Sequence, residues 1–264
     1  MSASSVHDPF ATLTAECTSR GMNLVGAVDA AAFDATQPCG RRAGERLAGC
    51  DTIVLLGAGG RAAWEAVQAR QGGSIGPARP GYHPIDAWSL DVAEQAAEQL
   101  RTLGCEVAVV PPDEQRPMNF RQLAEQVGFG TVSPVIGHLL HPEFGPWLSL
   151  RPALLVRGRP FGPRPPAPLG DFAPCGGCPQ PCRAACPSGT YRQPGSPDLL
   201  ACAEHRLEGG CGTGCDTLRA CPLGAEHRYG PEEEAFRHAY SLFRTRRWLG
   251  TGLWRFVPRR FRQG

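Results

Sequence analysis

Cysteine placement constrains the fold of this chain more than any other feature of its sequence. Eight of its twelve cysteines fall within the 47 residues from Cys175 to Cys221. The first ten residues, MSASSVHDPF, lack the charged start and apolar run of an export signal, so we expect a protein of the reducing cytoplasm. In that compartment, clustered cysteines are more often metal ligands than disulfide partners. No apolar run approaches the ~20 residues of a membrane span, and we expect no transmembrane segment.

The clustered cysteines form two groups of four, and each group ends in Cys-Pro. The first group reads Cys-x2-Cys-x3-Cys-x3-Cys-Pro, and the second reads Cys-x8-Cys-x3-Cys-x5-Cys-Pro. Because a [4Fe–4S] cubane takes four thiolates, the pattern predicts two such clusters. The predicted metal ligands are Cys175, Cys178, Cys182, Cys186, Cys202, Cys211, Cys215 and Cys221.

The proline after each group indicates which thiolates share a cluster. In two-cluster ferredoxins, the cysteine before proline ligates the cluster of the other group. We therefore predict that Cys221 completes the site begun by Cys175, and that Cys186 completes the site begun by Cys202. The spacing departs from the bacterial C-x2-C-x2-C-x3-C-P pattern by one residue in the first group and by more in the second. Two zinc sites of four thiolates each, or disulfides, are the alternatives.

The chain before the cysteines predicts an α+β domain over residues 1–157. Apolar, β-branched runs indicate strands, and amphipathic patterns indicate helices between them. The expected strands are 21–28, 51–56, 105–110 and 147–156, and the expected helices are 9–20, one ending at Arg70, 84–103 and 117–128. This alternation is typical of an α/β sandwich. Six of the seventeen residues in 158–174 are proline, which predicts an extended linker. The iron–sulfur domain then occupies 175–230, and a helix with a tail occupies 231–264.

A family resemblance supports this order of domains. The segment Gly130–Arg151, with the run His141-Pro-Glu-Phe-Gly-Pro-Trp147, resembles the core motif of the cobalamin-processing chaperones of the CblC type. More distantly, it looks like the Gly-Ser-Trp segment of epoxyqueuosine reductase and the reductive dehalogenases. The whole chain is similar to a bacterial group called simply ferredoxin. The shared features are that run, both cysteine groups, Gly57-x-Gly59-Gly60-x3-Trp64 and His83-Pro84-x-Asp86-x-Trp88.

The resemblance implies a fold, cofactors and contacts. It implies a nitroreductase-like, corrinoid-reductase-like domain followed by a small ferredoxin-like domain with two [4Fe–4S] clusters. It also implies cobalamin as a further cofactor, with His141, Trp147 and Arg151 in contact with it. The sequence offers no match for the proton-donating aspartate of epoxyqueuosine reductase, because Ser133-Pro134 and His138 occupy the region after Gly130.

Several motif residues also admit a structural interpretation. A cofactor pocket with a histidine as general acid could be lined by His83, Asp86, His138, His141, Glu143 and Arg151. Alternatively, His141 and Glu143 organise a turn, and Trp147 fills the core. The glycines of residues 57–60 resemble a dinucleotide-binding turn but lack its third spaced glycine, which favours tight packing instead. We interpret the four cysteines outside the two groups as small buried apolar residues.

The end of the chain is strongly basic. Residues 237–264 carry eight arginines and no acid, whereas the rest has 19 arginines against 25 acids, a net charge of −6. Aromatic residues lie between these arginines, at Phe243, Trp248, Trp254, Phe256 and Phe261. Such a tail could bind RNA or an anionic membrane surface, or it could dock on the acidic body.

These observations predict an iron–sulfur redox protein of the ferredoxin type, which passes single electrons through two clusters to a redox partner protein. The alternatives are a cobalamin-dependent reductase related to epoxyqueuosine reductase and a corrinoid-handling protein. The missing proton donor favours the electron carrier.

Overall fold

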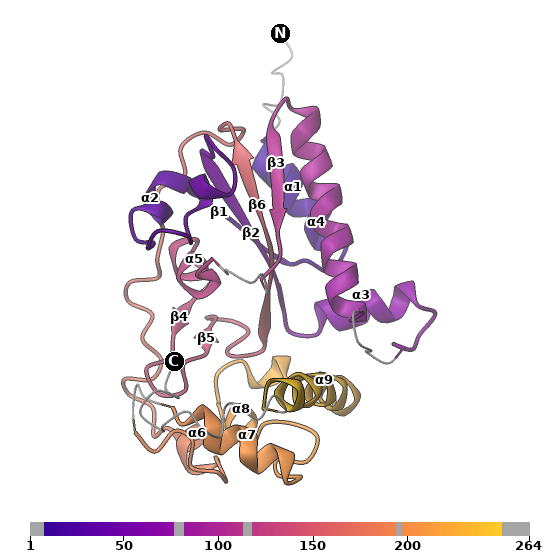
Figure 1. The fold of residues 1–264 in the computed structure, drawn as a ribbon, viewed down its shortest axis with the longest axis vertical. Helices are drawn as coiled ribbons and strands as arrows, with labels where there is room; N and C mark the ends of the chain where they lie inside the picture. Colours follow the sequence, from indigo (N-terminus) through magenta and orange to yellow (C-terminus); the bar gives the residue numbers. More distant parts are fainter. Residues whose placement is uncertain (1–7, 77–81, 113–117, 194–196, 250–264) are drawn as a thin grey trace. The chain divides into compact units, whose positions relative to one another are not determined.

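The chain forms two compact units, which interleave in sequence. The computed structural model describes residues 8–76, 82–112, 118–193 and 197–249 (Figure 1). One unit, here the sheet unit, comprises the chain up to Gly130 and returns over Leu148–Gly170. The other, here the cysteine unit, comprises Thr131–Trp147 and the chain from Asp171. Residues 131–147 were expected in the N-terminal domain, but they belong to the cysteine unit.

The sheet unit is built on a four-stranded sheet in the order β1-β2-β6-β3, in which every neighbouring pair is antiparallel. The fold is therefore mixed α and β, as predicted. Its elements in chain order are α1 (Pro9–Ser19), β1 (Leu24–Asp29), α2 (Ala30–Asp34), η1 (Ala43–Glu45), β2 (Thr52–Gly59), α3 (Ala62–Arg70), α4 (Pro84–Thr102), β3 (Glu106–Val110), α5 (Phe120–Gln126) and β6 (Leu148–Arg157).

The two central strands form the core of this unit. Every residue of β2 is buried, which explains why the apolar run at 51–56 predicted a strand. The strand continues to Gly59, so the glycines expected to form a turn lie largely within it. A β-carbon at Gly57 would lie 3.2 Å from Leu24 and 3.4 Å from the Phe129 ring, so a side chain there would crowd both. Gly57 therefore serves close packing.

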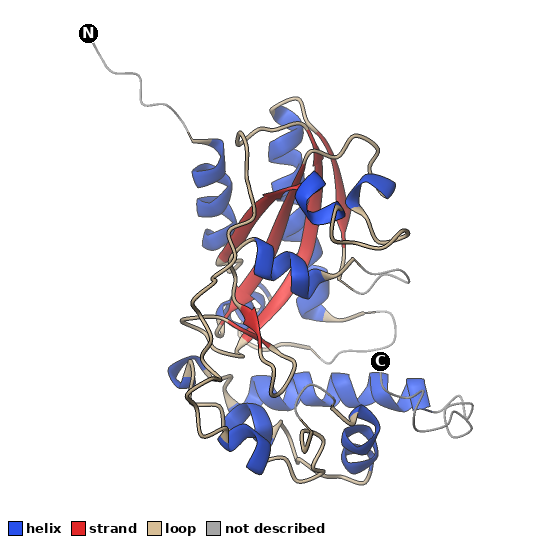
Figure 2. Ribbon diagram, turned by 90° about the vertical axis from the view of Figure 1, so that its left-hand side faces the viewer, coloured by secondary structure: helices blue, strands red, loops and turns tan. Residues whose placement is uncertain are grey.

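Helices cover both faces of the sheet (Figure 2). On one face, α4 packs against β3 and β6 and also contacts α1 and α3. Pro84 opens α4, and His83 Nδ1 caps it by accepting from the Asp86 N–H at 3.2 Å. On the other face lie α2 and α5. Helix α5 begins later than predicted, because Asn119 caps it by accepting from the Gln122 N–H at 3.2 Å.

The proline-rich segment is extended, as predicted, but most of it is bound to the sheet unit. The Asp29 N–H donates to the Arg164 carbonyl at 2.7 Å, and the Ala167 N–H donates to the Gln126 carbonyl at 2.8 Å. The Phe10 and Phe161 rings also meet edge to face, with centroids 5.2 Å apart. Up to Gly170, these contacts make the segment a strap along the sheet unit.

The cysteine unit consists of short elements joined by loops. They are β4 (Thr131–Val132), β5 (Leu139–Leu140), α6 (Pro181–Ala184), α7 (Leu199–Leu207), α8 (Asp216–Arg219), η2 (Ala225–His227) and α9 (Pro231–Leu249). Strands β4 and β5 pair in antiparallel fashion. Their segment meets the end of the cysteine region backbone to backbone, because a β-carbon at Gly145 would collide with the Leu223 carbonyl oxygen.

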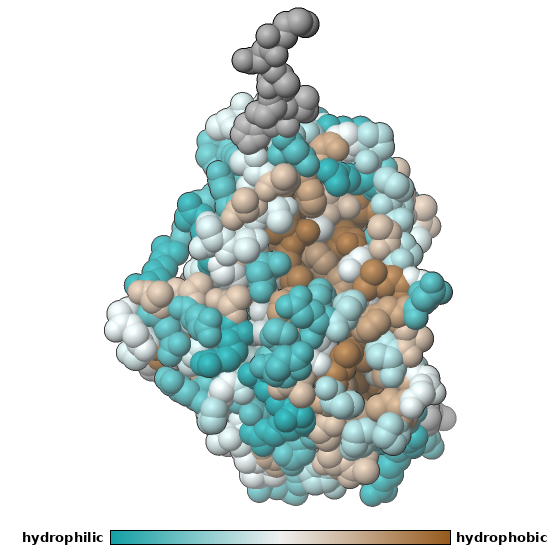
Figure 3. All heavy atoms as spheres, turned by 180° about the vertical axis from the view of Figure 1, so that it is seen from behind, coloured by the Kyte–Doolittle hydropathy of each residue, from teal (hydrophilic) through white to brown (hydrophobic). Residues whose placement is uncertain are grey.

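On the face drawn in Figure 3, hydrophobic residues form patches between hydrophilic ones. Among the described helices, none is long and apolar enough to span a bilayer. Cys17 is buried, Cys50 and Cys105 are partly buried, and Cys39 is exposed, so the expectation of burial was wrong for Cys39. Its short loop exposes it beside Glu45, whose carboxylate lies 3.3 Å from its sulfur. Residues 250–264 of the arginine-rich tail lie outside the described residues.

The contact at Gly145 gives a matched pair of variants. Gly145 and Gly137 both have a positive φ, but an added β-carbon at Gly137 meets nothing within 4 Å. We expect Gly145→Ala to lower the free energy of unfolding of the cysteine unit by about 1–3 kcal/mol more than Gly137→Ala does. Urea unfolding, followed by absorbance and circular dichroism, measures the difference. Equal destabilisation by the two variants would contradict the packing of residues 131–147 in this unit.

Candidate metal centre

Two short helices position four of the eight clustered cysteines. Cys182 lies in α6 and Cys186 lies just beyond its end, whereas Cys215 caps the start of α8 and Cys221 lies just beyond its end. The two helices pack on each other (Figure 1). Each helix therefore positions two thiols of its own sequence group, and the later thiol of each pair precedes proline.

The thiols meet in two sets of four. Cys221 lines a cavity of ≈ 40 Å³ together with Cys175, Cys178 and Cys182, and we name these four the Cys221 set. Cys186 lies near Cys202 and Cys211, each of which also lies near Cys215, and these four are the Cys186 set. The structure thus groups the side chains in the crossed manner predicted from the two Cys-Pro ends. Their role as metal ligands stays a prediction.

Packing four thiols together opposes their ionisation. Burial, followed by the charge of Cys221, raises the pKa of Cys182. Burial likewise raises the pKa of Cys202 and Cys211, with neighbouring thiolates adding to the effect. A cationic metal core removes this penalty, because it binds thiolates and cancels their repulsion. The composition of each set therefore suits a metal centre.

Hydrogen-bond donors surround the sulfurs. The Gln180 N–H donates to Cys178 Sγ at 3.4 Å, and the Ser133 hydroxyl lies 3.3 Å from Cys175 Sγ. At Cys186, burial opposes ionisation, but the hydroxyls of Ser188, Thr217 and Thr190 outweigh it and lower the pKa. Donors to thiolate sulfur are a recurring means of tuning iron–sulfur clusters.

The spacing of the thiols bears on the type of metal centre. Among the described residues, no group of three or more His, Cys, Asp or Glu side chains could hold a metal ion as it stands. Four thiolates around one zinc ion, each at ~2.3 Å, lie roughly 3.8 Å from one another. In a cubane each thiolate binds a different iron atom, so the four sulfurs surround a wider volume. The distances between the thiol sulfurs therefore distinguish the two kinds of site.

An apolar layer adjoins both sets. Tyr191 is buried with Val135, Ile136 and Cys182, and Cys175 and Cys186 pack against this group. Burial, followed by the charge of Cys215 and Cys202, raises the pKa of the Tyr191 phenol, so it stays neutral at physiological pH. This layer therefore contacts Cys175 and Cys182 of one set and Cys186 of the other.

The residues expected to contact a corrinoid have partners within their own units. His141 Nδ1 accepts from the Glu143 and Phe144 N–H groups at 3.0 and 3.2 Å, so its ring caps a turn. Burial lowers its pKa, and the neutral ring carries its proton on Nε2. Trp147 is 1% exposed and packs edge to face on Tyr229. The geometry therefore fits the interpretation in which His141 organises a turn and Trp147 fills the core.

Arg151 lies in the sheet unit, whereas His141 and Trp147 lie in the cysteine unit. Its guanidinium donates to Asp86 Oδ1 at 3.0 Å. Burial opposes the charge of Asp86, but His83 and Arg151 outweigh it and hold its pKa below the usual range. Three of the candidate pocket residues therefore form one partly exposed ion-pair network, which does not include His141.

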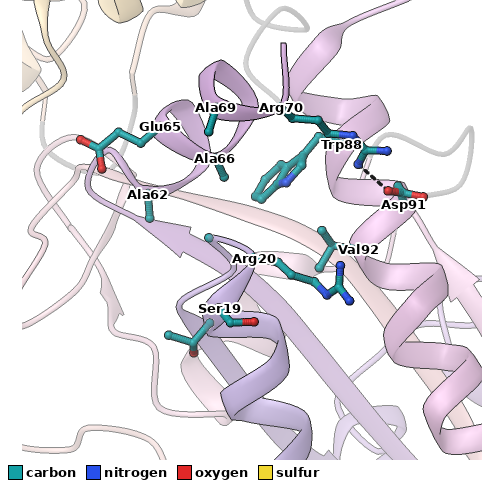
Figure 4. A pocket seen from close by; sticks show the side chains of 12 residues that line it. Ser19, Arg20, Ala62, Glu65, Ala66, Ala69, Arg70, Trp88, Asp91 and Val92 are labelled. Carbon is teal, nitrogen blue, oxygen red and sulfur yellow. Dashed lines mark hydrogen bonds and ion pairs between the residues drawn. The ribbon is translucent and has the colours of Figure 1, made fainter. Parts of the chain in front are cut away.

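A second hollow lies in the sheet unit, with a volume of ≈ 470 Å³ (Figure 4). Alanine side chains of α3 face Trp88 and Val92 of α4, and Arg20 lies on the third side. Arg70 and Asp91 form an ion pair across its edge. None of the residues predicted to hold a cofactor lines it.

Five residues beside the clustered cysteines were not among the predicted site residues: Ser133, Ser188, Thr190, Thr217 and Tyr191. Ser188 and Thr190 follow Cys186-Pro187 closely, so their position was a usable signal. Ser133 is 42 residues from Cys175, and no local pattern connects the two.

Known proteins resemble this chain in fold. No family model and no curated protein matches its sequence. A selenomethionine-labelled epoxyqueuosine reductase is 18% identical with a TM-score of 0.59, covering 85% of this chain and 68% of that one. The same enzyme type with an epoxyqueuosine-modified tRNA stem loop gives 18% identity and a TM-score of 0.60, with the same coverage. A catabolic reductive dehalogenase with 3-bromo-4-hydroxybenzoic acid gives 19% identity and 0.55, covering 90% of this chain and 37% of that one.

These comparisons confirm the expected similarity of fold to epoxyqueuosine reductase and the reductive dehalogenases. A further reductive dehalogenase is described as B12-dependent, with 18% identity and a TM-score of 0.54. The resemblance to the cobalamin-processing chaperones and to the bacterial ferredoxin group stays a prediction.

The crossed sets predict an unequal outcome for two cysteine variants. Cys221→Ser should damage the cluster that Cys175 helps to hold, although Cys221 belongs to the second sequence group. Cys186→Ser should damage the other cluster, because its remaining ligands are Cys202, Cys211 and Cys215. Electron paramagnetic resonance of each reduced variant measures which signal is lost. Loss of the opposite signal in each variant would show that the ligands do not cross.

Proposed function

We propose that this protein is an iron–sulfur oxidoreductase that passes single electrons through two [4Fe–4S] clusters. The observation that carries the proposal is the pair of four-thiol sets, held by α6 and α8. When bound, each cluster takes up and releases one electron. The chain supplies the ligands, the donors to sulfur and the apolar layer beside them.

The two sets are close enough for electrons to pass between them. Cys182 lies in α6 and Cys186 lies two residues beyond its end, and both pack in one apolar cluster. One thiol belongs to the Cys221 set and the other to the Cys186 set. Electron exchange between the clusters then needs no movement of the chain.

We further propose that a corrinoid accepts these electrons. Similarity of fold supports this, since it extends over 85% or more of this chain to epoxyqueuosine reductase and a reductive dehalogenase. The residues expected to hold the corrinoid do not add support, because His141, Trp147 and Arg151 are engaged within the chain.

That engagement favours a second candidate, an electron carrier between partner proteins. A carrier needs the cysteine unit and a docking surface, but it needs neither a corrinoid nor a proton donor. In this case, the sheet unit serves as the scaffold that the partner recognises.

Titration with hydroxocobalamin separates the two candidates. Anaerobic protein is reduced with dithionite, desalted and mixed with hydroxocobalamin. If the acceptor is a corrinoid, calorimetry should show binding at micromolar concentration, and absorbance should show one electron per cobalt moving from cluster to cobalt(III). Cys221→Ser, which retains the sheet unit, should still bind cobalamin but transfer fewer electrons. Absence of binding by the iron-replete protein would leave the electron carrier as the proposed function.

A further inference from the structure

Ser133 occupies a well-defined position beside the Cys221 set. Its side chain is buried, at 2% exposure, and its hydroxyl lies 3.3 Å from Cys175 Sγ. Its backbone is fixed on both sides, since its N–H donates to the His138 carbonyl and its carbonyl accepts from the Gly137 N–H, at 2.8 and 2.9 Å. The hydroxyl thus has little freedom to move away from the sulfur.

The hydrogen bonds of Ser133 determine the direction of its proton. Its Oγ lies 3.2 Å from both the Val135 and the Ile136 N–H groups, and both donate to it. A serine hydroxyl has two lone pairs and one proton, so these two donors occupy its acceptor capacity. The proton is left to point at Cys175 Sγ, and Ser133 is the donor in that contact.

We propose that Ser133 sets the reduction potential of the cluster held by the Cys221 set, by donating a hydrogen bond to the Cys175 thiolate. The inference rests on the proposed function, because it requires that this set hold a cluster. One-electron reduction takes the cubane core from 2+ to 1+ and adds one negative charge, which spreads to the thiolates. A donor stabilises the more negative state, so the hydrogen bond raises the potential.

The surroundings of Ser133 strengthen its effect. Val135, Ile136 and Leu140 line the same cavity as Cys175, so the hydrogen bond lies among apolar side chains. In such a low-dielectric site, a hydrogen bond to a charged group is stronger than it is in water. The segment that supplies Ser133 therefore also supplies the groups that shield it.

Ser188 provides a matched control at the other set. Its hydroxyl lies 3.4 Å from Cys186 Sγ and 2.7 Å from Thr190 Oγ1. Ser133→Ala and Ser188→Ala each remove one hydroxyl, but each acts on a different set. If hydrogen bonding tunes the clusters, the two variants should shift different signals.

The test is a redox titration of the full chain, followed by electron paramagnetic resonance. Iron and labile sulfide are measured first, because absence of clusters in the wild-type protein would contradict the proposed function, not the role of Ser133. The Cys221→Ser and Cys186→Ser variants assign each signal to its set. In iron-replete Ser133→Ala, we expect the ratio of reduced to oxidised Cys221-set cluster at a fixed potential to fall by up to about tenfold, equal to ~59 mV for one electron. Ser188→Ala should leave this ratio unchanged.

A second pair of variants distinguishes loss of the hydroxyl from a folding defect. Ser133→Thr and Ser133→Val add the same bulk, but only threonine keeps the hydroxyl. We expect Ser133→Thr to retain the wild-type potential and Ser133→Val to lower it. In the reduced wild-type protein, electron–nuclear double resonance should also detect an exchangeable proton coupled to the Cys221-set cluster that Ser133→Ala loses and Ser188→Ala retains. Equal potentials in iron-replete wild-type and Ser133→Ala protein, or absence of that proton, would overturn the proposal.

Discussion

Close packing of thiols across two short helices is the constraint on which the cysteine unit depends. Helix α6 contains Cys182 of the Cys221 set and is followed by Cys186 of the other set, and α8 lies between Cys215 and Cys221, which also belong to different sets. Neither set can then form without the other sequence group. Because adjacent thiolates repel and burial disfavours their charge, the arrangement requires a cationic core to be stable in its ionised form. Folding of this unit and binding of metal should therefore be coupled.

The segment Thr131–Trp147 serves this arrangement more than it serves the sheet. Ser133 faces Cys175, and Val135 and Ile136 join the apolar layer between the thiol sets. His141 shapes the turn that leads to Gly145, where two backbone segments meet. The segment thus helps to enclose the Cys221 set.

Sequence patterns predicted those features that local chemistry determines. The fully buried strand β2, the amphipathic helix from Pro84 and the two groups of cysteines all have short-range signatures. The unit to which residues 131–147 belong could not be predicted, since it depends on contacts with residues some 80 positions later, such as that of Gly145 with Leu223. The donor role of Ser133 was inaccessible for the same reason. Proline content indicated an extended segment near Arg164 but not the hydrogen bonds that bind it to the sheet unit.

The metal and sulfide content of anaerobically purified protein tests the central claim most directly. Two cubanes on eight thiolates predict about eight iron atoms and about eight labile sulfides per chain, with a Mössbauer spectrum of cubane type. The protein should be brown and should bleach when dithionite is added. Zinc without sulfide, or four iron atoms with four cysteines free to alkylation, would contradict the assignment of both sets.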